Sequence, residues 1–86
     1  MKKSDLIQAV ETRRGTSSYG VWTIGVTDDP QLRKDQHNND GKDVQYWTQW
    51  RTDSESDGRD TEKYFLDRGM KGGTGGGGYA KYVYIF

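Results

Sequence analysis

Arg33 and His37 are the pair of residues whose types and spacing best suit a chemical task. They lie four positions apart in a segment predicted to be helical, so their side chains share one helix face. A guanidinium offers a rigid fork of donors that fits a phosphate, and an imidazole exchanges a proton near neutral pH. The pair therefore suits phosphodiester chemistry. The alternative is a solvated helix face on which the two residues meet by coincidence.

Glu62 is a candidate metal ligand. It is expected on a later helix, three and four residues before Phe65 and Leu66, so its carboxylate lies beside an apolar face. A buried charge is costly without a partner, and one carboxylate with waters and substrate phosphates is enough to hold Mg²⁺. The alternative is an edge residue or an ion pair with Arg59 or Lys63.

The end of the chain carries three tyrosines, Tyr79, Tyr82 and Tyr84, in a predicted strand. In a regular strand Tyr82 and Tyr84 point to one face and Tyr79 to the other. A tyrosine serves as a general base or orients water where its neighbours support that role. The alternative for these residues is a place in the core or on the sheet surface.

Two other patterns do not qualify as sites. The glycine-rich tract 72–78 has no Gly-Lys-Ser/Thr and leads into a strand, so it is interpreted as a linker and not as a phosphate-binding loop. The acidic run Asp53–Asp60 lacks the spacing of an EF-hand calcium loop. It is interpreted as a solvated loop and the start of a helix.

Three helices and three strands are expected to position these residues. The helices are predicted over Ser4–Arg14 with Ser4 as the cap, from Asp29-Pro30 to about His37, and from Asp57 or Arg59 to Arg68 with Gly69 as the stop. The strands are predicted over Tyr19–Val26, Asp43–Trp50 and Tyr79–Phe86, with turns or loops at Asn38–Gly41 and Thr52–Gly58 and a flexible Gly-rich segment at 71–78. This order predicts an α+β fold with a small, mainly antiparallel three-stranded sheet and flanking helices.

Composition predicts one domain over residues 1–86. Only 30% of the residues are hydrophobic, but three Trp, six Tyr and two Phe supply the large apolar side chains that a small core needs. Trp22, Trp47 and Trp50 are expected in that core, with base-stacking platforms as the alternative. No segment has the length or the apolar character of a membrane span or a signal peptide, and cysteine is absent, so a cytoplasmic location is expected. The net charge of zero does not predict strong charge-driven binding to nucleic acid, although it leaves room for a local basic face.

The stretch from Trp22 to Thr27, with the helix after it, resembles the second half of the GIY-YIG endonuclease signature. Arg33 lies eight residues after Gly25 and His37 twelve residues after it, and both spacings match that family's pattern. Thr27 matches the small hydroxyl residue after the glycine. Glu62 matches the family's metal-binding glutamate on a later helix.

The first half of the signature resembles the end of the chain, Tyr82–Phe86, with Tyr84 at the signature tyrosine. The resemblance therefore implies a circularly permuted GIY-YIG-like domain, in which this last strand pairs antiparallel with Tyr19–Val26. Permutation of this kind is physically inexpensive where chain termini lie at the surface. Thr23 departs from the pattern because it replaces the second signature tyrosine, and the later asparagine of many members has no match.

The resemblance implies metal-dependent phosphodiester hydrolysis of DNA. Tyr84, together with His37, would deprotonate the attacking water, and Arg33 would stabilise charge on the pentavalent phosphate. Glu62 would hold one divalent metal ion such as Mg²⁺, and Thr23, Gly25 and Thr27 would line the site. No small-molecule cofactor and no membrane partner are expected.

Two alternatives remain open at this point. The first is a catalytically degenerate GIY-YIG-like fold that acts as a nucleic-acid or protein interaction module, as Thr23 and the neutral charge suggest. The second is a structural protein in which the spacing is coincidental. In that second case Arg33, His37, Glu62 and Tyr84 would not converge in space.

Overall fold

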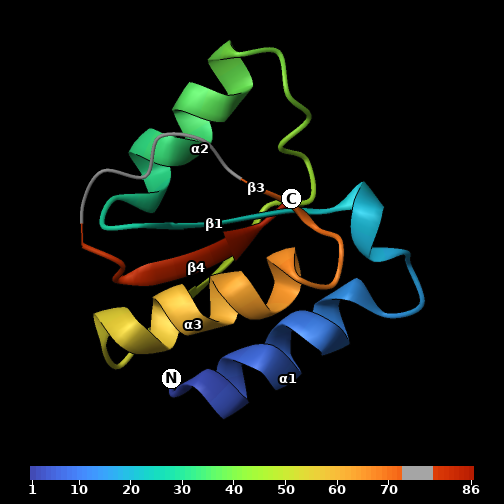
Figure 1. The fold of residues 1–86 in the computed structure, drawn as a ribbon. Helices are drawn as coiled ribbons and strands as arrows, with labels where there is room; N and C mark the ends of the chain where they lie inside the picture. Colours follow the sequence, from blue (N-terminus) through green and yellow to red (C-terminus); the bar gives the residue numbers. More distant parts are fainter. Residues whose placement is uncertain (73–78) are drawn as a thin grey trace.

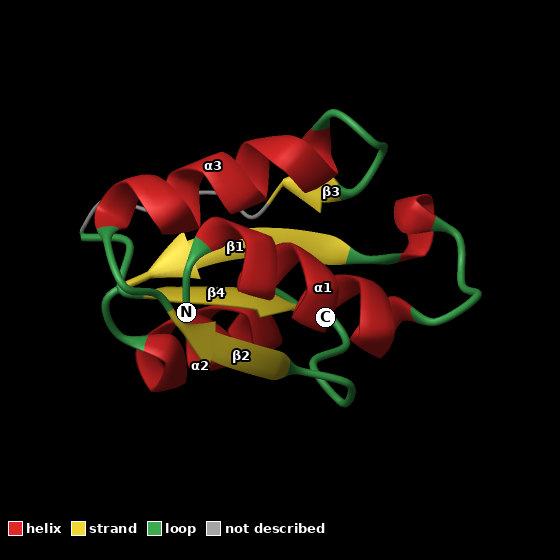
Figure 2. Cartoon of the chain, turned by 90° about the horizontal axis from the view of Figure 1, so that it is seen from below, coloured by secondary structure: helices red, strands yellow, loops and turns green. Residues whose placement is uncertain are grey.

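The structure is a computed structural model that describes residues 1–72 and 79–86. In these residues three α-helices flank a mixed four-stranded sheet of order β2-β4-β1-β3 (Figures 1 and 2). The helices are α1 (Lys3–Arg14), α2 (Pro30–Asn39) and α3 (Glu55–Leu66), with a short 3-10 turn η1 (Tyr19–Val21). The strands are β1 (Thr23–Thr27), β2 (Thr48–Arg51), β3 (Lys71–Gly72) and β4 (Tyr82–Ile85). The α+β class predicted from the sequence is confirmed.

The last strand lies beside the first, as expected. β4 pairs antiparallel with β1, in a register that runs from Ile24 opposite Ile85 to Thr27 opposite Tyr82. β2 covers the other edge of β4 in the same antiparallel sense. The first and last strands of the described chain are thus neighbours at the centre of the sheet.

The prediction of three strands was wrong by one. Lys71 and Gly72 form β3, which pairs parallel with Thr23 and Ile24 of β1. Both residues belong to the segment 71–78 that is predicted to be flexible, and the rest of that segment, 73–78, lies outside the described residues. A two-residue Lys-Gly strand has neither alternating polar and apolar residues nor β-branched side chains, so no local sequence pattern predicts it.

All three predicted strands begin too early, and the last strand starts at Tyr82 and not at Tyr79. Tyr19–Val21 forms a 3-10 turn, closed by a hydrogen bond from the Trp22 amide to the Tyr19 carbonyl, and the strand starts only at Thr23. The Asp43–Trp50 prediction fails in the same way, because a turn in which the Trp47 amide donates to the Val44 carbonyl precedes β2. Aromatic and β-branched residues favour strands in general, and here tertiary packing overrides that preference.

The start of α2 follows its sequence signals. The Asp29 side chain accepts a hydrogen bond of 3.1 Å from the Leu32 amide, and Pro30 occupies the first turn. The helix continues two residues beyond the predicted end at His37, to Asn39. This start directs the helix face of Arg33 and His37 toward the sheet.

The other two helices begin at different residues from those predicted. Ser4 is not the cap of α1; the helix begins at Lys3, and Lys2 in the cap position makes no side-chain cap. α3 begins at Glu55, because the Ser54 hydroxyl accepts a hydrogen bond from the Asp57 amide. Part of the segment predicted as a Thr52–Gly58 loop is therefore helical.

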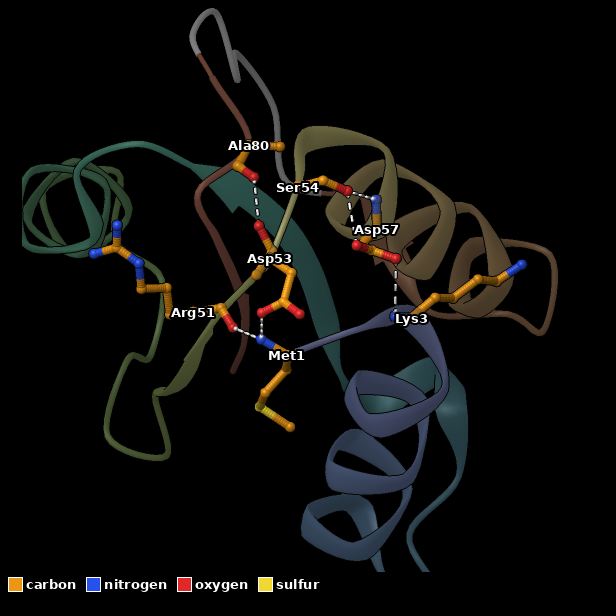
Figure 3. Close-up of polar contacts among 8 residues, drawn as sticks. Met1, Lys3, Arg51, Asp53, Ser54, Asp57 and Ala80 are labelled. Atoms are coloured by element: carbon orange, nitrogen blue, oxygen red, sulfur yellow. Dashed lines mark hydrogen bonds and ion pairs between the residues drawn. The ribbon is translucent and has the colours of Figure 1, made fainter.

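A polar cluster replaces the missing cap of α1 and fastens the start of the chain (Figure 3). The Met1 amine lies 2.6 Å from the Asp53 carboxylate and donates to the Arg51 carbonyl at 2.9 Å. The Lys3 amide donates to the Asp57 carboxylate at 3.1 Å, which ties the first turn of α1 to the first turn of α3. Exposed ion pairs of this kind contribute about 0.2–1 kcal/mol each, so the cluster fixes geometry more than it adds stability.

The two faces of the sheet have different roles. α1 and α3 lie on one face and α2 on the other (Figure 1). The apolar core fills the α1–α3 side, with Ile24 of β1 and Val83 of β4 fully buried within it. Because side chains alternate along a strand, Gly25 and Tyr84 face the α2 side. In the part of the chain that the structure describes, no helix has the length and apolar character to cross a membrane.

Candidate functional site

Tyr84 occupies the centre of the sheet face that α2 covers. It lies opposite Gly25 in the β1–β4 register and its side chain is fully buried, at 0% exposure. A Cβ atom added at Gly25 would lie 2.3 Å from the Tyr84 Oη and 2.4 Å from its Cζ. The tyrosine ring therefore lies directly across the glycine, and its position requires that residue 25 have no side chain.

α2 brings His37 and Arg33 to the tyrosine hydroxyl. The His37 Nε2 lies 2.9 Å from the Tyr84 Oη, and the imidazole is 1% exposed. The Arg33 Nη2 lies 3.5 Å from the same Nε2, and Arg33 also forms a hydrogen bond with Tyr84. Arg33 and His37 thus share one helix face, as predicted, and together with Tyr84 they form a three-residue polar cluster, Arg33–His37–Tyr84.

The donors in this cluster fix the direction of its hydrogen bonds. A guanidinium only donates, and the Arg33 Nη2 lies 3.5 Å from the His37 Nε2, so we assign Nε2 as an acceptor to which the Tyr84 hydroxyl donates. The neutral imidazole then carries its proton on Nδ1, which is buried and has no hydrogen-bond partner among the described residues. The arrangement is a short relay in which Arg33 polarises the phenol and His37 is placed to receive its proton.

The cluster shifts the pKa values of its members in opposite directions. Burial lowers the pKa of His37, and the charges of Arg33 and Lys42 lower it further, against a smaller opposing effect of Asp40. Burial raises the pKa of Tyr84; the hydrogen bond and charge of Arg33 lower it, and the charge of Glu62 raises it. At neutral pH His37 is therefore a neutral acceptor and Tyr84 a protonated donor.

Aromatic rings cover the hydroxyl cluster. The Trp47 ring stacks on the Tyr84 ring with centroids 4.2 Å apart and planes 12° apart. Phe86 lies beside both, 5.4 Å from Trp47 and 4.7 Å from the His37 ring. The Trp47 indole N–H donates to the Gln49 side chain at 2.8 Å, which holds the ring in place. A water or phosphate reaches the Tyr84 hydroxyl only when this cover moves.

Glu62 comes from the opposite layer. It lies on α3, on the other side of the sheet from α2, and it is partly buried. Burial raises the pKa of Glu62, and the charge of Arg59 lowers it in part. Its effect on the pKa of Tyr84 places the carboxylate within electrostatic reach of the cluster. Arg33, His37 and Tyr84 are thus in contact, whereas Glu62 is connected to this cluster only by the small rise that its charge gives to the pKa of Tyr84.

The other three predicted site residues have separate positions. Gly25 is the platform under Tyr84. Thr23 is partly exposed on the same face of β1. Thr27 is buried, and its hydroxyl accepts from the Asp29 amide at 3.0 Å, so it shapes the turn from β1 into α2.

Glu62 is the one carboxylate among the predicted site residues. In the described ranges, 1–72 and 79–86, no group of three or more His, Cys, Asp or Glu side chains converges as a metal cage. A single carboxylate completed by waters and substrate phosphates is the arrangement that Mg²⁺ adopts in phosphoryl-transfer sites. Glu62, being partly exposed, has room for such ligands.

Sequence reasoning missed the covering residues. Trp47 was assigned to the main core and Phe86 to the end of a strand, whereas both rings pack around Tyr84 and His37. Trp22, in contrast, joins the core cluster as expected, and Trp50 packs against it. Three tryptophans and a terminal aromatic have no periodicity that assigns each to one face, so the sheet topology was needed to sort them.

His37 is the single histidine of the 86 residues, so its imidazole signals in a proton NMR titration report its pKa directly. We expect a value below the ordinary 6.5. Below about pH 6.5 the imidazole is then protonated in the unfolded chain but stays neutral in the folded chain. The free energy of unfolding therefore falls as the pH drops below about 6.5. Above that pH neither state is protonated and this contribution is constant.

The size of the effect is about 1.4 kcal/mol for each unit by which folding lowers the pKa. Urea unfolding of a His37→Gln variant is the control, since it should lose the pH dependence between about pH 5 and 6.5, where few carboxylates still titrate. An NMR pKa at or above 6.5 would contradict the buried neutral imidazole.

Comparisons of the chain with protein-family models, with curated proteins and with solved structures find no match.

Proposed function

We propose that the chain is a GIY-YIG-like, metal-dependent phosphodiesterase that cleaves DNA, with Arg33, His37 and Tyr84 as its catalytic residues. The observation that carries the proposal is the hydrogen bond of 2.9 Å between His37 and Tyr84. These residues are 47 positions apart in the sequence. Their contact is what a permuted arrangement of the signature requires.

The relay gives each residue a definite task. As the attacking water gives a proton to the Tyr84 Oη, the phenol proton passes to His37 Nε2, which is neutral and accepts it. The water oxygen bonds to phosphorus, and the bond from phosphorus to the leaving sugar oxygen breaks. Arg33 donates to the phosphate oxygens as negative charge builds on them.

Glu62 is the proposed ligand of a divalent cation such as Mg²⁺, with waters and a substrate phosphate as the other ligands. When bound, the cation would neutralise charge on the leaving oxygen. The partial exposure of Glu62, which leaves its carboxylate accessible to waters, supports this assignment.

The aromatic cover must open in this mechanism. Tyr84 is fully buried under Trp47, so the proposal requires that substrate displace the indole ring. Trp47 lies in the connection between α2 and β2, outside both elements, where a side chain moves without breaking a helix or the sheet. Displacement by a stacked nucleobase would restore the contact that Tyr84 loses.

The test is nicking of supercoiled plasmid with and without Mg²⁺, using wild type and an identically purified Arg33→Ala variant. We expect cleavage that chelation by EDTA abolishes, and a rate about 10²- to 10³-fold lower in the variant. Nicking that is equal in both proteins would point to a contaminating nuclease. Absence of nicking by the wild type over a range of divalent metals would remove the proposal.

A second candidate function is favoured by the same burial. If Trp47 stays closed, the Arg33–His37–Tyr84 cluster is a structural polar core, and the chain is a GIY-YIG-like interaction module without catalysis. The 0% exposure of Tyr84 is the specific observation in its favour. Hydrogen exchange and Trp fluorescence that do not change on adding DNA and Mg²⁺ would support this candidate over the enzyme.

A further inference from the structure

A basic groove lies next to the covered cluster. It has a volume of about 790 Å³ and runs between the end of α1, the start of β1, the segment after α2, and β3. The residues that give it its character are Arg13, Trp22, Lys42, Tyr46, Lys71 and Phe86. The chain as a whole has no net charge, so this concentration of cations is a local feature.

The groove is continuous with the candidate site. Phe86 lines it and also packs 4.7 Å from the His37 ring. Lys42 lines it and is one of the charges that lower the pKa of His37. Thr23, on the Gly25 face of β1, forms part of the same wall. A ligand seated in the groove therefore extends toward the hydroxyl cluster.

The charges in the groove are suited to phosphates. Arg14 on its rim is neutralised by Glu11 at 2.8 Å, and one acidic side chain, Asp43, lines the groove. The amino groups of Lys42 and Lys71 have no ion pair or hydrogen bond to any residue that the structure describes. Arg13 is fixed in the wall by a hydrogen bond of 2.7 Å to Thr48 and lies 5.5 Å from the centre of the Trp22 ring.

The aromatic residues in the groove are suited to bases. Tyr46 is 56% exposed and lines the groove, so its ring is open to a ligand seated there. Phe86 is partly exposed at the inner end. Cations that follow a backbone and rings on which bases stack are the two parts of a site for single-stranded nucleic acid.

We propose that the basic groove binds a single-stranded stretch of nucleic acid and leads its backbone to the Arg33–His37–Tyr84 cluster. This proposal rests on the proposed function, which identifies the ligand as a nucleic acid, and it adds that the bound ligand is single-stranded. A concavity of this size takes a small ligand or a short piece of one strand, not a duplex. Base faces are also hidden inside a duplex, where Tyr46 would have nothing to stack on.

The test is fluorescence anisotropy with a fluorescein-labelled single strand of about 12 nucleotides, in EDTA so that binding is measured without cleavage. We expect the single strand to bind more tightly than the matching duplex. Tyr46→Ala should weaken binding by about 5- to 150-fold, as loss of one stacked base does. Tyr79→Ala is the matched control, because Tyr79 is 52% exposed and does not line the groove, and it should change binding little.

A second variant pair isolates the lysines. Lys42→Ala/Lys71→Ala should reduce the slope of log K against log salt by about 1.4, from two lost phosphate contacts on a single strand. Lys63→Ala/Lys81→Ala removes the same charge outside the groove and should leave the slope unchanged. Circular dichroism and thermal unfolding of each variant separate loss of binding from loss of fold.

Each outcome bears on one proposal or the other. If the protein binds the single strand but does not nick DNA in Mg²⁺, the groove proposal stands and the nuclease proposal fails. If the protein nicks DNA but the groove variants bind the single strand as tightly as the control variants do, the groove proposal alone fails. Duplex bound as tightly as the single strand overturns the single-strand assignment. Polyglutamate is the competitor that tests for a general polyanion surface. If it displaces the labelled strand at the same concentration as unlabelled DNA does, the single-strand assignment is also overturned.

Discussion

Replacing Tyr84 with phenylalanine should lower the rate of Mg²⁺-dependent nicking by about 10²- to 10⁴-fold, the usual contribution of a positioned acid–base group. The change removes one oxygen and leaves the ring that stacks on Trp47. What disappears is the hydroxyl that lies 2.9 Å from His37 Nε2 and forms a hydrogen bond with Arg33. The prediction therefore isolates the relay from the packing around it.

The same substitution leaves His37 Nε2 buried without the donor at 2.9 Å, which costs about 1–3 kcal/mol of unfolding free energy. Urea unfolding must accompany the assay, which should be run where both proteins are folded. Tyr82→Phe is the matched control, since Tyr82 lies two residues earlier on the same strand and makes no hydrogen bond to the cluster. A Tyr84→Phe protein that nicks at the wild-type rate would remove the hydroxyl from the mechanism and favour the noncatalytic module.

The local signals in the sequence were enough for the parts of this cluster that depend on short spacing. Asp29 and Pro30 are signals for the start of α2. Because Arg33 and His37 are four residues apart and both lie in this helix, their side chains share one face. The antiparallel pairing of the last strand with β1 was expected from the resemblance to a permuted signature, and the register confirms the pairing. The contact of His37 with Tyr84 follows from these two facts together.

What the sequence did not predict depends on tertiary packing. β3 is two residues long and exists because β1 offers it a free edge. Trp47 lies in a segment whose alternation resembles a strand, yet it turns onto Tyr84 in place of pairing in β2. The basic groove is formed by five segments that are separated along the chain, and its local positive charge is not visible in a net charge of zero.

Gly25→Ala should lower the free energy of unfolding by about 1–3 kcal/mol, the cost of forcing a group into a packed interior. The new Cβ would lie under 3 Å from the Oη, Cζ and Cε2 of Tyr84, whose ring is fully buried and stacked on Trp47. The ring must shift, and its hydroxyl then leaves the 2.9 Å contact with His37. Urea unfolding measures the first effect, and a moved His37 imidazole signal in the NMR spectrum reports the second.

A double-mutant cycle shows whether the glycine serves the tyrosine or only the strand. Tyr84→Leu removes all three atoms that the added Cβ would strike, so Gly25→Ala in that background should cost less than about 0.5 kcal/mol. Gly20→Ala is the control for intrinsic glycine effects, because the nearest atoms to its Cβ lie 3.8 Å away. If Gly25→Ala is equally costly in both backgrounds, the penalty belongs to the backbone of β1. If the cost vanishes with Tyr84→Leu, residue 25 is a glycine because the Tyr84 ring lies across it, and that geometry brings the hydroxyl to His37.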